Sequence, residues 1–228
     1  MKNRLGVLGG SFNPIHLGHL HIAQRSLELF GLSQVYFVVA SAPPHKPPEE
    51  LISFTHRFAM TSLATSGLTG CLPSLAELEP PASPYTIDTL AKLARRFGVS
   101  GKELYFLAGG DSLLDVAGWH DSTRLLLSYN FIFVSRPGVP RPAAGVAVPP
   151  AAAARVVDAR GLEPERVRET IAAGLAAADP RIFLVEEDAP DVAASQIRQL
   201  ASLGQRIEHL VPAPVHEYIQ KQHLYGER

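Results

Sequence analysis

The sequence predicts an α/β fold with a doubly wound, mainly parallel sheet and helices on both of its faces. Three observations support this prediction. Short apolar runs of strand type alternate along the chain with segments of helical period. Two of the strand-like runs end in paired glycines, at 9–10 and 109–110. The 228 residues, 46% hydrophobic and 19% charged, are enough for one well-packed domain.

The first predicted unit of the sheet is a strand, a helix and a second strand. Residues 5–8 form an apolar run that ends in the first glycine pair. Residues 20–30 carry apolar groups at helical spacing and end before Gly31, a usual position for a helix stop. The β-branched and aromatic run 34–40 is typical of a buried strand. This order implies parallel pairing through a right-handed crossover.

The rest of the chain continues the alternation of strands and helices. Pro and Ala become frequent from residue 137 onward, and residues 137–162 are expected to form a flap within a single domain that spans 1–228. The further predicted strands are 72–78, 103–108, 130–135 and 181–185, and the further predicted helices are 53–64, 87–97, 163–176, a segment ending near 203, and 211–225.

The composition excludes several classes of function. A formal net charge of −1 without blocks of like charge argues against partners such as nucleic acid or an anionic membrane. The single cysteine, Cys71, allows no intrachain disulfide. No apolar run approaches the roughly 20 residues of a membrane helix, and the first residues lack the layout of a signal peptide. We therefore expect a cytoplasmic protein, and the sequence is compatible with a homo-oligomer.

The most informative stretch is residues 4–21, which passes from a strand through a glycine turn into a helix start. Such a start presents unpaired N–H groups and a positive dipole end, and glycine lets a phosphate approach the backbone. His16 and His19 flank Gly18, so both imidazoles can lean over one bound group. Taken locally, these residues could equally be a turn and surface histidines. Zinc binding would need a third ligand, and none lies nearby in sequence.

Five segments, in order along the chain, carry a resemblance to a known family. They are GGSFNP with H-x-G-H, PPHK, YTIDTL, GGDSLLDVAGWH and SRPG. Through them the chain resembles the bacterial nicotinate mononucleotide adenylyltransferases of the H-x-G-H nucleotidyltransferase superfamily, from Gly9 to Arg198. The resemblance implies one Rossmann-like nucleotidyltransferase domain. It also implies transfer of the adenylyl group of ATP to nicotinate mononucleotide, which gives nicotinate adenine dinucleotide and pyrophosphate in NAD biosynthesis.

The resemblance further implies roles for individual residues. The catalytic residues would be His16, His19 and Arg198. The ATP-binding residues would be Gly9, Gly10, Ser11, Phe12, Gly18, Gly109, Asp111 and Ser195. The residues that bind nicotinate mononucleotide would be Ser41, His45, Lys46, Tyr85, Thr86, Trp119 and Arg136.

The local pattern leaves other roles open for several of these residues. Asp111 and Thr86 could each cap a helix, and Arg136 could form a surface salt bridge. Trp119 would be a core residue by its type, although its glycine neighbour suggests an exposed position. The proline-rich loop 41–48 could be a solvated turn.

One segment departs from the family pattern. Where the pattern I-S-S-T-x-I-R has two serines, this chain has Ala193 and Ala194, while Ser195 and Arg198 keep their places. Two hydroxyl contacts to the triphosphate are therefore in doubt, although the helix-start N–H groups need no particular side chain.

The implied reaction needs no general base, because the attacking phosphate oxygen is already ionised. Mg2+ would be carried by the substrate phosphates, so no metal site built from protein side chains is expected. Two alternatives stay open. The protein could be an adenylyltransferase that prefers nicotinamide mononucleotide or another phosphate acceptor, or a catalytically weakened nucleotide-binding module.

Overall fold

The computed structural model describes residues 3–43, 51–136 and 147–226. Within these ranges, seven strands form one sheet in the order β3-β2-β1-β4-β5-β7-β6. Each neighbouring pair in the sheet is parallel, which confirms the predicted α/β fold. The strands are β1 (Leu5–Gly10), β2 (Gln34–Val39), β3 (Cys71–Ser74), β4 (Leu104–Gly109), β5 (Asn130–Ser135), β6 (Val156–Asp158) and β7 (Ile182–Glu186).

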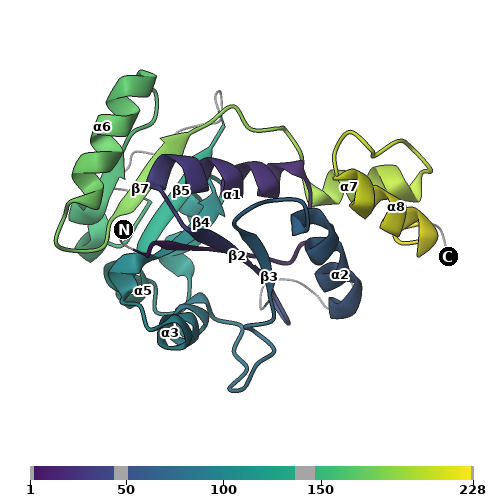
Figure 1. Cartoon of the computed structure of the whole chain (residues 1–228), viewed down its shortest axis with the longest axis horizontal. Coiled ribbons are helices and arrows are strands. Elements are labelled where there is room, and N and C mark those ends of the chain that lie inside the picture. The colour runs from purple at the N-terminus through teal and green to yellow at the C-terminus, as the bar shows by residue number, and fades with distance from the viewer. Residues whose placement is uncertain (1–2, 44–50, 137–146, 227–228) are drawn as a thin grey trace.

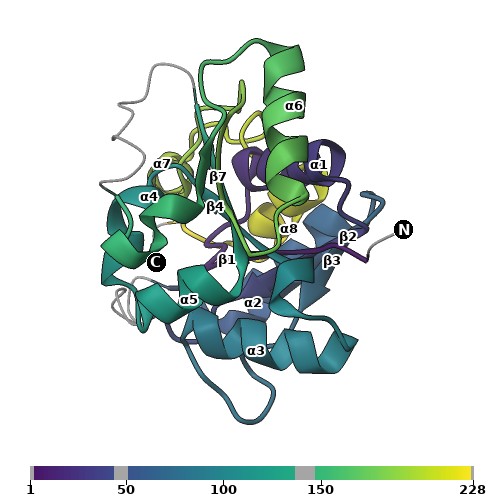
Figure 2. The same cartoon turned by 90° about the vertical axis from the view of Figure 1, so that its left-hand side faces the viewer.

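Helices cover both faces of the sheet. Figures 1 and 2 show α1 and α6 on one side and α3 and α5 on the other, while α7 and α8 lie together at one end of the molecule. None of the described helices combines the length and the apolar character needed to cross a membrane. The helices are α1 (Leu17–Phe30), α2 (Phe54–Thr65), α3 (Thr86–Phe97), α4 (Ser112–Asp115), α5 (Ser122–Ser128), α6 (Pro164–Leu175), α7 (Ala194–Ser202) and α8 (Ala213–Lys221).

Alternation along the strands creates one apolar core on each face. In β4, Leu107 packs into the core that includes α1, whereas its neighbour Phe106 packs into the core that includes α3. Both side chains are buried, so β4 is covered on both faces, as expected for a central parallel strand. The continuous apolar run of this strand is the sequence signal for that position.

Part of the segment expected to form a flap belongs to the sheet. Residues 156–158 form β6, which pairs with β7 at the sheet edge, and residues 150–155 form a short 3-10 helix before it. The remainder of the expected flap, at 137–146, lies outside the described residues. A three-residue strand within Ala-rich and Val-rich sequence is too short to show periodicity, so its pairing could not be predicted locally.

The order of the strands places a crevice between β1 and β4. From β1 the sheet continues through β2 and β3 in one direction, and from β4 it continues through β5 in the other. The connections therefore leave β1 and β4 toward opposite sides, and open α/β sheets bind ligands at the carboxyl ends of strands at such a switch point.

Candidate active site

A cavity of about 420 Å3 opens at this switch point. It is bordered by the turn after β1, the first residues of α1, the ends of β4 and β5, and the segment that leads into α7. Eight of the predicted site residues line it, namely Ser11, Phe12, His16, Gly18, His19, Gly109, Asp111 and Arg136.

The two histidines lie together at the N-terminus of α1. His16 is the N-cap residue, and its backbone N–H donates to Nδ1 of His19 at 3.3 Å. The ring centroids are 3.7 Å apart with an interplanar angle of 31°. Because Nδ1 of His19 accepts this hydrogen bond, the neutral ring carries its proton on Nε2. His19 can therefore donate from Nε2 to an anionic oxygen.

His16 is the more buried of the two histidines. Its residue is 8% exposed, and burial lowers the pKa of the imidazole to about 4. The ring is therefore neutral at neutral pH and interacts as a hydrogen-bonding group rather than a cation. A Cβ at Gly18 would lie 3.1 Å from Nδ1 of His16, so glycine at this position leaves room for the ring.

The turn between β1 and α1 is strained and supports His19. Phe12 adopts a left-handed conformation with φ of 45°, which is costly for a bulky residue, by about 1–3 kcal/mol. Its buried ring meets the ring of His19 edge-on, with centroids 5.0 Å apart. The turn therefore brings the ring of Phe12 into contact with the ring of His19.

The first glycine pair is structural and does not line the cavity. A Cβ at Gly9 would lie 3.2 Å from the ring of Phe106, and a Cβ at Gly10 would lie 3.1 Å from the ring of Phe12. These glycines let two aromatic rings pack against the end of β1. The resemblance implies that both bind ATP, and neither is among the residues that line the cavity.

The two glycines of the second pair differ in the space around them. Both glycines line the cavity, but a Cβ at Gly109 would meet nothing within 4 Å. A Cβ at Gly110 would lie 2.8 Å from Cβ of Ser135 and 3.0 Å from its Cα. The first glycine therefore leaves space for a ligand, and the second allows close packing against β5.

Alanine substitutions should separate these two roles. For Gly109→Ala, we expect the KM for ATP to rise about tenfold, with the unfolding temperature unchanged, because the new methyl group enters the cavity. For Gly110→Ala, we expect the free energy of unfolding to fall by about 1–3 kcal/mol through overpacking. Steady-state kinetics and thermal melts of both variants provide the test. Equal melting losses in both would contradict the assignment of Gly109 to the ligand space.

The far wall of the cavity is the segment that leads into α7. Ala193 is the N-cap residue and Ala194 the first residue of α7, and both line the cavity, so a second helix N-terminus faces the space reached by α1. Ser195 is exposed and is not among the lining residues. Arg136 lines the cavity and forms an ion pair with Asp191, which is the local alternative considered for it.

Arg198 contacts the turn after β1 and does not line the cavity. Its Nη1 donates to the backbone carbonyl of Asn13 at 2.9 Å, and Arg198 is not among the lining residues. Asn13 does line the cavity. In this conformation Arg198 acts on the site through the turn after β1.

A second group of predicted residues gathers on the α3 side of the sheet. Trp119 is half-buried and packs edge-on against Phe106, with ring centroids 5.7 Å apart. The exposed ring of Tyr85 stacks on His120 at 4.0 Å. Thr86 had been placed as an N-cap, but it is the first residue of α3 and Tyr85 is the N-cap. His45 and Lys46 lie outside the described residues.

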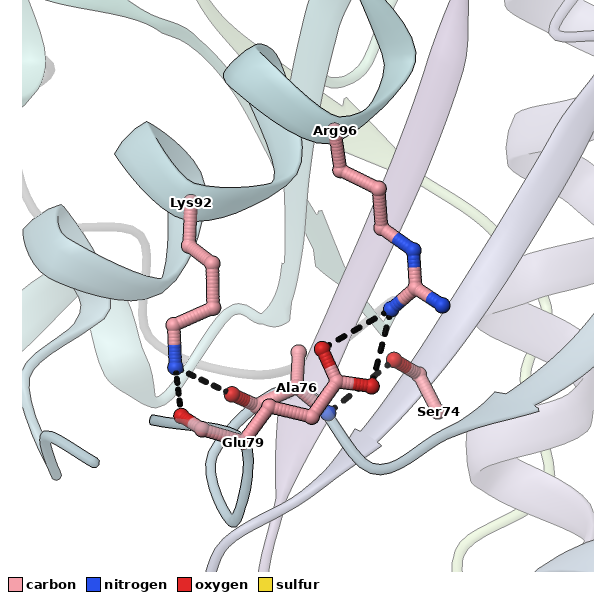
Figure 3. Close-up of polar contacts among 5 residues, drawn as sticks. All are labelled: Ser74, Ala76, Glu79, Lys92 and Arg96. Carbon is pink, nitrogen blue, oxygen red and sulfur yellow. Dashed lines mark hydrogen bonds and ion pairs between the residues drawn. The ribbon is translucent and has the colours of Figure 1, made fainter. Parts of the chain in front are cut away.

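The position of α3 is fixed by contacts to the loop before it. Lys92 donates to the backbone carbonyls of Ala76 and Glu79, and Nη1 of Arg96 donates to both carboxylate oxygens of Glu79 at 2.9 and 3.0 Å (Figure 3). These contacts join α3 to the first residues of the β3–α3 connection, just after the carboxyl end of β3.

Two buried charged residues contact predicted site residues without lining the cavity, and they were not predicted from the sequence. Oε2 of Glu77 accepts from the backbone N–H of Ser41 at 2.9 Å, and burial raises the pKa of its carboxyl group. Arg57 is only 2% exposed, and burial lowers the pKa of its guanidinium group. By its charge alone, Arg57 would be expected at the surface or in a supporting position. Its spacing of three residues from Met60, on the buried face of α2, was the available signal.

Metal ligands do not cluster in the described part of the chain. No group of three or more His, Cys, Asp or Glu side chains there is placed to hold a metal ion. The histidine pair is stacked beside the cavity, and among the described lining residues Asp111 is the one carboxylate.

Comparisons with known proteins agree with this geometry. The cytidylyltransferase-like family profile matches residues 7–200. A Geobacter metallireducens protein named probable nicotinate-nucleotide adenylyltransferase is 37% identical over 222 residues, 97% of this chain and 98% of that protein. A Thermomicrobium roseum protein with the same name is 36% identical over 223 residues, 98% of this chain and 92% of that protein.

A solved structure shares the fold over nearly the whole chain. It is the Plasmodium falciparum nicotinic acid mononucleotide adenylyltransferase complexed with NaAD, with a TM-score of 0.70 at 18% identity. The superposition covers 98% of this chain and 97% of that chain. Given the family match and the full-length relatives, the chain belongs to the cytidylyltransferase-like family and, within it, to the nicotinate-nucleotide adenylyltransferases.

Proposed function

We propose that the protein transfers the adenylyl group of ATP to nicotinate mononucleotide, giving nicotinate adenine dinucleotide and pyrophosphate. One observation carries the proposal. The H-x-G-H histidines and the N-termini of α1 and α7 border one cavity at the switch point of the sheet. Donors and dipoles that converge in this way suit a triphosphate.

The chemistry is a displacement at the α-phosphorus of ATP. A phosphate oxygen of the acceptor forms the new bond, and the bond from the α-phosphorus to the oxygen bridging to the β-phosphorus breaks. The nucleophile is already ionised, so catalysis rests on positioning and on stabilising charge that moves to pyrophosphate. His19 would donate from Nε2 to a phosphate oxygen, and neutral His16 would add a hydrogen bond.

The donor set of the cavity fits a divalent ion that arrives with the nucleotide. With Asp111 as the one carboxylate among the described lining residues, most ligands of Mg2+ would be phosphate oxygens and water. Such an ion would supply charge neutralisation at the leaving pyrophosphate. The protein residues would orient the phosphates around it.

The acceptor is assigned to the α3 side of the crevice. The rings of Tyr85 and Trp119 offer stacking surfaces for a pyridine. Thr86, as the first residue of α3, places a hydroxyl group and a helix N-terminus where a carboxylate would be favoured over an amide. The positive charge of Arg136 would favour the acid in the same way, although its present partner is Asp191.

Pyrophosphate release with ATP and magnesium tests the proposal, with nicotinate mononucleotide compared against its amide. We expect a strong preference for the acid. Equal rates with both acceptors would support adenylyl transfer but contradict a site that recognises the carboxylate. ATP binding without pyrophosphate release would instead favour a weakened nucleotide-binding module, a reading motivated by Ala193 and Ala194 at the cavity wall.

A further inference from the structure

The end of the chain returns to the turn that follows β1. We call residues 11–14 the nucleotide turn. The hydroxyl group of Tyr225 donates to Oδ1 of Asn13 at 2.9 Å, across 212 positions of sequence. Nη1 of Arg198 donates to the backbone carbonyl of the same Asn13 at 2.9 Å. Asn13 is 2% exposed, so both contacts are made away from bulk water.

A third donor reaches the same turn from α2. Nη1 of Arg57 donates to the carbonyl of Ser11 at 2.8 Å and to the carbonyl of Ala40, beyond β2, at 2.7 Å. Its Nε donates to the carbonyl of Ile52 at 3.1 Å. The nucleotide turn is therefore held by α2, by α7 and by the segment after α8.

These contacts surround the strained residue of the turn. Phe12, with its φ of 45°, lies between Ser11 and Asn13, and its ring contacts His19. A costly backbone conformation persists only where its surroundings fix it. Tyr225 is suited to this task, because a tyrosine hydroxyl group is protonated at neutral pH and can donate, and burial raises the pKa of this one further.

We propose that Tyr225 is a positioning residue for the nucleotide turn, acting through the side chain of Asn13. Together with Arg198 and Arg57 it forms a three-point support that keeps Ser11, Phe12 and thereby His19 in the geometry needed for the triphosphate. This inference rests on the proposed function for its catalytic consequence. Its structural part, the stabilisation of the turn, can be measured without any substrate.

Tyr225→Phe tests the proposal, with Tyr218→Phe as its matched control. Tyr218 lies in α8, and its hydroxyl group is 2.9 Å from Nδ1 of His56 in α2. Each variant loses one hydroxyl hydrogen bond and keeps its ring. We expect kcat/KM for ATP to fall about three- to tenfold in Tyr225→Phe, with the KM for the mononucleotide unchanged, and to stay within about twofold in Tyr218→Phe.

Amide hydrogen exchange in the absence of nucleotide supplies the second readout. We expect faster exchange in a peptide covering residues 11–16 in Tyr225→Phe, and unchanged exchange there in Tyr218→Phe. If the wild-type protein is inactive but the exchange difference between the variants is found, the proposed function is overturned and the role of Tyr225 in holding the turn is retained. Unchanged exchange in Tyr225→Phe, or loss of its fold, would overturn the positioning role.

Discussion

Replacing His19 with alanine is expected to lower kcat by about 100- to 1,000-fold while the protein keeps its fold. A loss of this size is typical when one preorganised donor to developing negative charge is removed. The orientation of the ring supports such a role, because Nδ1 is engaged by the backbone N–H of His16 and leaves Nε2 as the donor. Pyrophosphate release at saturating concentrations of both substrates measures the effect.

The stability of the same variant should change little. His19 is half-buried, and its ring contact with Phe12 contributes about 0.5–1.5 kcal/mol. His21→Ala is the matched control, because His21 lies on the same helix and is not among the lining residues of the cavity. Near-normal turnover in His19→Ala, or an equal loss in His21→Ala, would show that the phosphate site has been assigned to the wrong residue.

His16 is less suited to a clean test of catalysis. Its imidazole is buried and packed against Gly18, so its removal would leave space in the protein as well as remove a hydrogen-bonding group. A loss of activity in His16→Ala would therefore mix stability with chemistry. His19 is only half-buried, so its substitution allows the two effects to be separated.

The central part of the fold could be predicted because its signals are local. The strand and helix before Gly31 were recognised from apolar period and a glycine stop, and Gly31 does adopt the left-handed conformation at the end of α1. The start of α1 was placed three residues late. His16 and Gly18 mark this helix start, and neither carries the apolar period that identifies a helix interior.

The site could be predicted in part, and mainly where backbone turns determine it. Ser11 and Gly109 were assigned to ATP binding and His19 to catalysis, and all three line the cavity. Gly9 was assigned with them, but a glycine next to a ligand and a glycine under an aromatic ring look alike in sequence. The distinction depends on Phe106, almost a hundred residues away.

The supports of the site could not be predicted from local pattern. The hydrogen bond from Tyr225 to Asn13 joins the two ends of the chain, and no periodicity relates such residues. Arg57 is a second example, because a charged residue on the buried face of a helix normally indicates an error in the predicted face. Its burial is favourable only because carbonyl oxygens from three separate segments converge on it.

Arg57→Met is expected to cause the largest loss of stability. The substitution removes the donors to the carbonyls of Ser11, Ala40 and Ile52, and it removes a positive charge that interacts electrostatically with buried Glu77. Removing one partner from a buried charged network costs about 3–5 kcal/mol. For a chain of this length that loss lowers the unfolding temperature by about 6–20 °C. Urea unfolding gives the free energy and thermal melts give the temperature.

Arg96→Met is the matched control, because it removes an exposed arginine and so shows how much of the stability loss in Arg57→Met is due to burial. Arg96 makes two hydrogen bonds to Glu79, but its side chain is 51% exposed and that of Glu79 is 40% exposed (Figure 3). An exposed ion pair of this kind contributes about 0–1 kcal/mol, because water solvates either partner when the other is lost. Equal losses in the two variants would contradict the argument, since buried carbonyls without donors would then cost no more than an exposed carboxylate. If Arg57→Met loses more free energy of unfolding than Arg96→Met, and Arg57→Lys loses less than Arg57→Met, the difference is due to the buried hydrogen-bond donors.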